Sequence, residues 1–347
     1  MLTEYEWRRQ VGQRSHRNAS ICGAQCVLET SHGKRLIRDR SFHVFLLLLS
    51  FSVAAVLPMF VPVKEKEVFS QVYPVTETKQ QPRQISTISY RLPQYLEYRQ
   101  HTFTQAELLR GNMLLIDAEH PLPPNVPFPN TLSIAVYGKG RVPVRNLQLK
   151  SGKETINNLA ALFISLQSRQ IAGLMVFDAT HSRAEQQALL EEHTRSLMGS
   201  LSPNEAVEQA LQSLDWPGTG ELQQEYTVEI RPASADSSRS WQELLQNAWK
   251  YGFVRSTPNV DGREEYRFRW VGNAHATAMT YLNLSLKDYL LWLHEKRCLV
   301  IEEKEKIRYL ILCQPMNGTH TAFMLPEGAD VEVSLDNMGY AVAACTF

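Results

Sequence analysis

The segment GREEYRFRWVG, residues 262–272, carries the pattern that decides how the rest of the chain is interpreted. From Tyr266 to Val271, aromatic side chains alternate with Arg267 and Arg269, which is typical of a β-strand whose two faces meet different surroundings. A guanidinium between Tyr266 and Phe268 needs a charged partner or a function, and the segment alone supplies no reason for it.

Length and composition indicate an ordinary globular protein. The 347 residues are 44% hydrophobic and 21% charged, enough for one large or two modest domains with a substantial core. The formal net charge is zero, and no basic stripe interleaved with aromatic residues occurs beyond the first 40 residues. These features argue against a nucleic-acid partner.

The five cysteines do not give the paired spacing of a zinc ribbon. Cys22 and Cys26 form a single C-x3-C near the N-terminus, which is weak evidence for a metal. Cys298 falls in an apolar run and is expected to be buried. Cys313 and Cys345 fall on two predicted C-terminal strands, so a disulfide between them is one possibility in an oxidising compartment.

Residues 41–63 form a run of 23 residues without a charged side chain. This length spans a bilayer as a helix, and it predicts a single transmembrane signal-anchor. Residues 1–40 hold eight Lys and Arg against four acidic residues, which predicts a basic cytoplasmic tail. A signal peptide cleaved near Ser52–Ala55 is the main alternative, and a buried core helix is another. With an anchor or a cleaved signal, residues 64–347 are expected outside the cytoplasm.

The chain beyond the apolar run divides into three expected parts. Residues 64–103 are polar and predict a stalk, residues 104–300 a mixed domain, and residues 301–347 a β-rich C-terminal appendage. A short helix after Thr104 and a strand over Asn112–Ile116 are expected at the start of the domain. Further predicted elements are helices over residues 155–170, 183–198, 202–214, 240–253 and 285–296, and a strand over 225–230.

Six segments, in this order, resemble motifs of the VanY-like D-alanyl-D-alanine carboxypeptidases, bacterial zinc enzymes that trim peptidoglycan stem peptides. They are GNMLLIDAEHPLP (111–123), FDATHSRAEQQ (177–187), WPGTGELQQEYTVEI (216–230), SWQELLQNAWKYGFV (240–254), EEYRFRWVG (264–272) and LKDYLLWL (286–293). The resemblance implies an α+β fold, with a small antiparallel sheet flanked by helices. The strands over 225–230 and 266–271 should then lie side by side.

The resemblance also locates the family's zinc ligands, two histidines and an aspartate. Those positions hold Leu222, Glu229 and Arg267 in this chain, and only Glu229 can coordinate a metal. The family's general base position holds Glu264. Because catalytic zinc needs about three protein ligands and an open position for water, the resemblance predicts degenerate metal positions and no cofactor. Arg267 is expected to pair with Glu229 or Glu264 in the place of the metal.

The family's substrate-binding positions are partly retained. His181 replaces the arginine expected to bind the peptide carboxylate, while Ser182 and Gln186 are kept. The resulting hypothesis is a membrane-anchored, extracytoplasmic and catalytically inactive protein that binds peptidoglycan peptide or a protein partner. The alternative is an active D-alanyl-D-alanine carboxypeptidase that uses zinc in a rearranged site.

Overall fold

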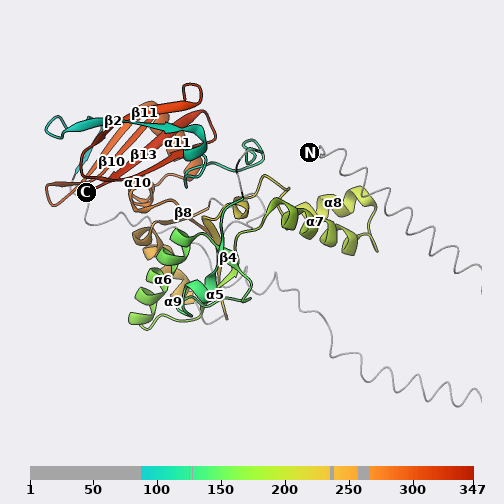
Figure 1. Cartoon of the computed structure of the whole chain (residues 1–347). Coiled ribbons are helices and arrows are strands. Elements are labelled where there is room, and N and C mark those ends of the chain that lie inside the picture. The colour runs from blue at the N-terminus through green and yellow to red at the C-terminus, as the bar shows by residue number, and fades with distance from the viewer. Residues whose placement is uncertain (1–86, 125, 127, 235–237, 257–265) are drawn as a thin grey trace, which may run out of the picture. The chain divides into compact units, whose positions relative to one another are not determined.

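The computed structural model describes residues 87–124, 126, 128–234, 238–256 and 266–347 (Figure 1). Within these residues, none of the helices has the length and apolar character needed to cross a membrane. The predicted transmembrane helix over 41–63 and the tail over 1–40 lie outside the described residues, as do Cys22 and Cys26.

A four-stranded antiparallel sheet carries the motifs found in the sequence. Its strand order is β5 (Leu174–Asp178), β6 (Thr227–Pro232), β8 (Arg267–Trp270) and β7 (Phe253–Arg255). The predicted adjacency of the two motif strands is confirmed, since β6 pairs with β8 over three residues. Gly252, with φ of 80°, begins the turn into β7 at the position where the sequence predicted a helix end.

A five-stranded antiparallel sheet contains most of the C-terminal strands. Its order is β1 (Thr87–Ser89), β9 (Cys298–Glu303), β10 (Lys306–Pro315), β13 (Tyr340–Thr346) and β12 (Asp330–Leu335). Two small pairs complete the strands, β2 (Tyr98–Thr104) with β11 (His320–Pro326) and β3 (Leu132–Ser133) with β4 (Lys150–Ser151).

Helices form at each of the predicted places, and the described residues contain two further helices, over residues 134–137 and 273–282, that the sequence did not predict. They are α4 (Gln105–Leu108), α5 (Ile134–Tyr137), α6 (Lys153–Ser168), α7 (Arg183–Leu197), α8 (Pro203–Leu211), α9 (Ser238–Asn247), α10 (Asn273–Leu282) and α11 (Leu286–Lys296), with short 3-10 turns η2 (Glu221–Gln223) and η4 (Ala248–Tyr251). Thr104, Ser182 and Ser285 cap α4, α7 and α11 by accepting a backbone N–H.

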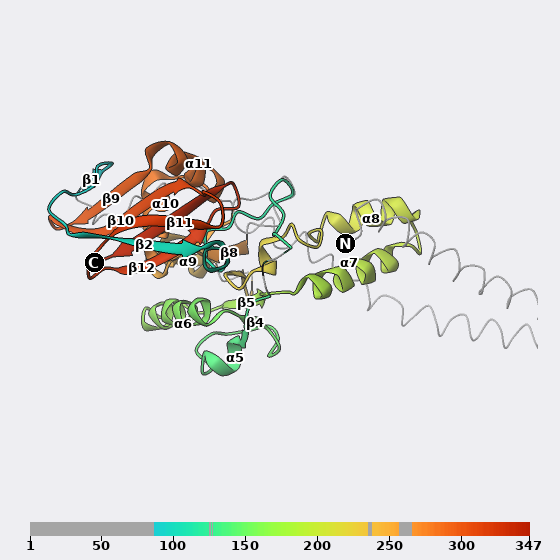
Figure 2. The same ribbon diagram turned by 45° about the horizontal axis from the view of Figure 1, so that its top comes forward.

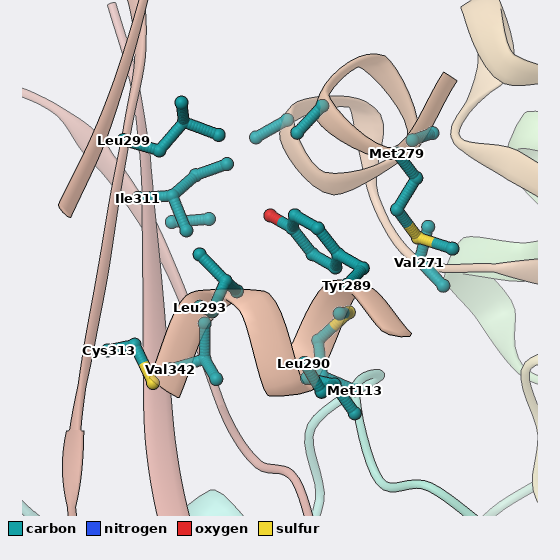
Figure 3. Close-up of a cluster of buried hydrophobic side chains, with 14 of the residues drawn as sticks. Met113, Val271, Met279, Tyr289, Leu290, Leu293, Leu299, Ile311, Cys313 and Val342 are labelled. Atoms are coloured by element: carbon teal, nitrogen blue, oxygen red, sulfur yellow. The ribbon is translucent and has the colours of Figure 1, made fainter. Parts of the chain in front are cut away.

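The five-stranded sheet is buried on both faces. Alternate residues of β9, β10 and β13 pack on one side against α10 and α11, around Tyr289, Leu290 and Leu293 (Figure 3). The intervening residues pack on the other side with Leu108 of α4 and Phe323 of β11. Figure 2 shows β2 and β11 alongside the sheet strands. Both faces are apolar, which explains the near-continuous hydrophobic runs in these strands.

This arrangement changes two of the expected boundaries. Residues 87–104 form β1 and β2, which pair with β9 and β11, so the predicted stalk over 64–103 extends too far. The predicted limit between residues 300 and 301 falls inside β9. The C-terminal strands share one core with α10 and α11 because the sheet needs those helices to cover its apolar face.

The predicted entry strand over Asn112–Ile116 does not form a strand. Its backbone is hydrogen-bonded to other partners: Met113 N–H donates to Ser334 Oγ at 3.0 Å and Leu115 N–H to the Asp336 carbonyl at 3.0 Å. The guanidinium of Arg269 binds the carbonyl oxygens of Asn112 and Leu114. The segment therefore satisfies its polar groups without a neighbouring strand.

The disulfide considered for Cys313 and Cys345 is excluded by the strand register. Cys313 pairs with Val342 and Cys345 with Leu310, an odd offset that places the two thiols on opposite faces of the sheet. All three described cysteines are free and buried, including Cys298 as expected. Burial raises the pKa of the Cys313 and Cys345 thiols to about 12.

Because a buried thiol with a raised pKa supplies little thiolate, these cysteines should resist alkylation in the folded protein. We expect a C22S/C26S variant to incorporate no iodoacetamide at pH 8 in its native state, and to be labelled at Cys298, Cys313 and Cys345 after unfolding in guanidinium. Peptide mass spectrometry measures both. Rapid native labelling of Cys313 or Cys345, or a peptide linking them, would contradict the register.

Candidate functional site

Three charged residues face one another across the four-stranded sheet. Asp178 of β5 pairs in register with Glu229 of β6, and Glu229 pairs in register with Arg267 of β8. The register of β5 shifts between Val176 and Asp178, a bulge that brings Asp178 opposite Glu229. Residues paired in register project from the same face of a sheet, so a carboxylate, a carboxylate and a guanidinium form one row.

Glu229 is buried and its nearest cation comes from its own strand. The Arg231 Nε donates to Glu229 Oε1, and the two side chains share a face because they are two residues apart. Burial raises the pKa of the Glu229 carboxyl, and the charge of Asp178 adds to this effect, whereas Arg231 and Arg267 oppose it. The Glu229 carboxyl, predicted as the remaining metal ligand, is thus already bonded to Arg231.

Arg267 makes its ion pair with Asp215, a residue that the sequence did not single out. Its Nη2 lies 2.8 Å from Asp215 Oδ2, and the two side chains are only 6% and 12% exposed. The expected pairing with Glu229 is therefore replaced by Arg267–Asp215 and Glu229–Arg231. Arg231 reaches Glu229 because the two residues lie on the same strand. Arg267 meets Asp215 because the tertiary fold brings these two distant residues together. Glu264, the other expected partner, lies outside the described residues.

His181 forms a hydrogen-bonded pair with Asp178. Its Nε2 lies 2.7 Å from Asp178 Oδ1, and its backbone N–H donates to the Leu222 carbonyl at 2.8 Å. Burial lowers the pKa of His181, but the hydrogen bond and the negative charge of Asp178 outweigh burial and the pKa is raised. The imidazole is therefore already hydrogen-bonded to a carboxylate of this chain.

Ser182 and Gln186 support the start of α7. The Ser182 hydroxyl accepts the N–H of Glu185, and the Glu185 carboxylate accepts the N–H of Ser182, which is a complete capping box. The buried Gln186 side chain donates to the Asp215 carbonyl at 2.8 Å. Gln186 therefore positions the backbone of the residue that pairs with Arg267.

Leu222 is 5% exposed and lies in η2, next to a second buried arginine. Arg269 is 1% exposed, and its Nη2 donates to the Leu114 carbonyl and to Gln224 Oε1, each at 2.8 Å. Its Nη1 lies 3.5 Å from Glu221 Oε1. Burial lowers the pKa of Arg269, and Glu221 opposes that shift.

The three positions that the sequence compared with zinc ligands are thus brought into one region. Glu229 and Arg267 are direct neighbours, and Leu222 is connected to them through His181 and Asp178. Leucine offers no lone pair, and a guanidinium is a donor that repels a cation. The donor set at these positions does not fit zinc.

Asp178, Asp215 and Arg231 take part in the site although no sequence motif singled them out. Asp178 and Arg231 had a detectable signal, because Asp178 lies three residues before His181 and Arg231 lies two residues after Glu229 on a predicted strand. Asp215 had none, since its contact with Arg267 spans 52 positions of the chain.

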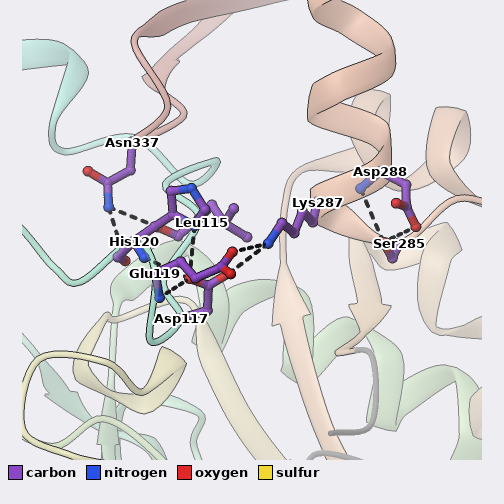
Figure 4. Close-up of polar contacts among 8 residues, drawn as sticks. All are labelled: Leu115, Asp117, Glu119, His120, Ser285, Lys287, Asp288 and Asn337. Carbon is purple, nitrogen blue, oxygen red and sulfur yellow. Dashed lines mark hydrogen bonds and ion pairs between the residues drawn. The ribbon is translucent and has the colours of Figure 1, made fainter.

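One group of side chains could hold a metal ion by geometry alone. Asp117, Glu119 and His120 each offer a ligand atom, and these atoms lie within 4.8 Å of one another (Figure 4). Lys287 already contacts both carboxylates, with its Nζ 2.6 Å from Glu119 Oε2 and 3.8 Å from Asp117 Oδ2. His120 Nδ1 is 2.8 Å from Asp117 Oδ1. The Lys287 ammonium group thus places beside these two carboxylates the positive charge that a metal ion would otherwise supply.

Comparison with known proteins gives matches only among solved structures, since no protein-family model and no curated protein matches the chain. The vancomycin-resistance D,D-dipeptidase VanXYg, in complex with a D-Ala-D-Ala phosphinate analogue, aligns with a TM-score of 0.58 and 18% identity over 72% of this chain and 99% of that chain. The D,D-pentapeptidase VanY of the VanB-type cassette, in complex with Zn(II), aligns with a TM-score of 0.42 and 20% identity over 52% of this chain and 98% of its own. DacB from Streptococcus pneumoniae D39 aligns with a TM-score of 0.34 and 20% identity over 40% of this chain and 76% of its own.

The alignment with VanXYg covers nearly all of that chain and establishes the fold. The chain has a VanY-like peptidase fold, of mixed α+β class with small antiparallel sheets, as the ordered motifs predicted. Similarity of fold leaves the activity to be argued from the residues of the site.

Removing the guanidinium from the buried pair should destabilise the protein strongly. We expect Arg267→Ala to lower the free energy of unfolding by about 3–5 kcal/mol, because Asp215 would remain buried without its ion-pair partner. Urea denaturation measures the change. Arg169→Ala is the control, since the more exposed pair of Arg169 with Glu243 should contribute only about 0–1 kcal/mol. Equal losses for the two variants would contradict the buried pair.

The His181–Asp178 pair should stabilise the fold in acid more than in base. The folded-state pKa of His181 is raised, so its contribution is complete below the unfolded pKa of about 6.5 and disappears as the pH rises through the folded value. We expect the stability difference between the parent and His181→Gln to be larger at pH 5.5 than at pH 9. Urea denaturation at both values measures it, and NMR titration of the His181 ring measures the pKa. A difference that grows with pH would overturn the assignment.

Proposed function

We propose that this chain is a membrane-anchored, extracytoplasmic carboxypeptidase-like protein that binds a peptidoglycan peptide or a protein partner without hydrolysing it. Two independent supports lead to this proposal. The fold is similar to that of the D,D-dipeptidase VanXYg, whose structure holds a D-Ala-D-Ala phosphinate analogue. The residues at the compared metal positions cannot perform metal-assisted hydrolysis.

The observation that carries the loss of catalysis is the buried ion pair between Arg267 and Asp215. In metal-assisted hydrolysis, a bound metal ion lowers the pKa of water and so creates the nucleophile. A permanently charged guanidinium beside Glu229 supplies positive charge there but has no lone pair for coordination. It can neutralise the neighbouring carboxylates, and it cannot activate water in this way.

A binding role is supported by a pocket beside the altered positions. The pocket has a volume of about 330 Å³, within the range of small-ligand sites. Leu109, Val126, Phe128 and Pro129 provide an apolar wall, and Arg110, Asn130 and residues 223–226 provide polar groups. This combination suits a short peptide with one apolar side chain.

The polar side of this pocket is held firmly by neighbouring elements. The Glu225 carbonyl accepts hydrogen bonds from Ser151 Oγ and Thr155 Oγ1, each at 2.8 Å. Burial raises the pKa of the Glu225 carboxyl and also that of the Tyr226 hydroxyl. A pre-formed polar wall lowers the entropy cost of binding a ligand.

The anchor is proposed from the sequence, because residues 41–63 are long and apolar enough to span a bilayer and follow a basic segment. This topology would place the peptidase-like fold outside the cytoplasm, where peptidoglycan peptides occur.

The alternative function is zinc-dependent cleavage through a rearranged site, and the group Asp117, Glu119 and His120 is the observation in its favour. The contacts of Lys287 with both carboxylates weigh against it, because binding a divalent ion would require displacement of that ammonium. We therefore give priority to binding without hydrolysis.

The purified full chain should release no D-alanine from a stem peptide ending in D-Ala-D-Ala and should contain no stoichiometric zinc. Restoring the three compared ligands in an L222H/E229D/R267H variant should introduce zinc binding, because the site would again offer three donors. Metal analysis and D-alanine release measure both expectations, and a variant with only Leu222→His serves as control.

Zinc-dependent release of D-alanine by the unmodified chain, abolished by Glu264→Gln, would overturn the proposal. If the chain binds zinc and loses it in a His120→Gln variant, the rearranged site is supported instead. Isothermal titration with the uncleaved stem peptide separates the two binding partners, since a protein-binding module should show no heat of binding.

A further inference from the structure

Helices α5 and α6 border a groove on the surface that the proposed function does not use. Its volume is about 630 Å³, and its lining includes Val136 and Tyr137 of α5 and Ala160, Ala161 and Ile164 of α6. The groove is distinct from the pocket at residues 223–226, because the two share no lining residue.

The spacing of residues along α6 creates the depression. Ile156, Ala160 and Ile164 follow one another at four-residue intervals and therefore lie along one side of the helix. The short side chains of Ala160 and Ala161 leave space between the two isoleucines. The stretch from Ile156 to Ile164 is about 12 Å long at 1.5 Å per residue, which equals about two turns of a helix laid beside it.

The rim of the groove is unusually apolar for an exposed surface. Val136 is 78% exposed, Ile164 42% and Tyr137 36%. Leu147, 74% exposed, adjoins the same place because its carbonyl accepts a hydrogen bond from Ser133 Oγ at 3.3 Å. Clustered large apolar side chains rimmed by polar groups mark interaction sites more often than isolated ones do.

The charged residues that line the groove have a single sign. Lys139 and Arg141 are the charged residues among its lining, and both are exposed. Lys153 lies three and four residues before Ile156 and Asn157, so it shares their side of α6. The neighbouring Glu154 is exposed on α6 and is not among the residues that line the groove. An occupant with carboxylates would therefore meet cations at the rim.

We propose that the groove between α5 and α6 docks an acidic amphipathic helix of a partner protein. Apolar side chains spaced as i, i+3/i+4 and i+7 would fill the space over Ala160 and Ala161, as in other helix-in-groove complexes. Carboxylates flanking that stripe would pair with Lys139, Arg141 and Lys153 and would fix the direction of the helix. This inference rests on the surface alone and is independent of the loss of the metal ligands.

The test uses the purified full chain and two labelled amphipathic helical peptides of about 20 residues. Both carry leucine at i, i+3, i+4 and i+7, and they differ only in having Glu or Lys on the flanks. Fluorescence anisotropy should show the Glu peptide binding at least about tenfold more tightly than the Lys peptide. An A161W variant should weaken Glu-peptide binding by at least about tenfold by filling the groove, and K139E/R141E should reverse the preference. Lys306→Glu, an exposed change on β10, is the matched control and should leave the affinity unchanged.

Equal affinity for the two peptides, or binding that survives A161W, would overturn the proposal. Sedimentation of the full chain tests for a second copy as occupant, and flotation with vesicles of phosphatidylglycerol tests for a lipid surface. Self-association or vesicle binding that is lost in A161W, without a preference for the Glu peptide, would replace the proposed helix by that occupant.

Discussion

The buried guanidinium of Arg269 connects the two main sheets of this protein. It projects from β8 of the four-stranded sheet and binds the carbonyl oxygens of Asn112 and Leu114, whose neighbouring residues are hydrogen-bonded to the end of β12 in the five-stranded sheet. It also holds Gln224 and Glu221 beside η2. Burying a charge is costly unless the charge is paired and hydrogen-bonded, so this arrangement depends on all of these partners being in place together.

On the four-stranded sheet, the residues at the positions compared with zinc ligands are paired with other side chains of the chain. Asp178, Glu229 and Arg267 lie in register, and each is paired with a partner from elsewhere: His181, Arg231 and Asp215. Two ion pairs and one histidine–aspartate hydrogen bond engage the groups that would otherwise bind a cation or a substrate carboxylate. These side chains are therefore paired with other groups of the chain, and one pocket lies beside them while another lies on α5 and α6.

The C-terminal strands illustrate how a segment that looks separate in sequence becomes part of a single core. Strands β9, β10 and β13 have apolar residues on both faces, and neither face could remain in water. Helices α10 and α11 cover one face, while α4 and β11 contribute to the other.

The sequence by itself determined the local features. Side-chain alternation predicted β6 and β8, the helical spacing of apolar residues predicted α6, α7 and α11, and the ordered motifs predicted the VanY-like fold. It also determined the chemistry of Leu222 and Arg267, because a side chain without a lone pair cannot bind a metal in any fold. Tertiary structure decided the partners. Asp215 contacts Arg267 because the fold brings two distant parts of the chain together. The register between β10 and β13 places Cys313 and Cys345 on opposite faces of the sheet. The carbonyl of Leu114 in the entry segment accepts a hydrogen bond from Arg269. These outcomes depend on which distant segments meet and in which register, and no local pattern of residues encodes that choice.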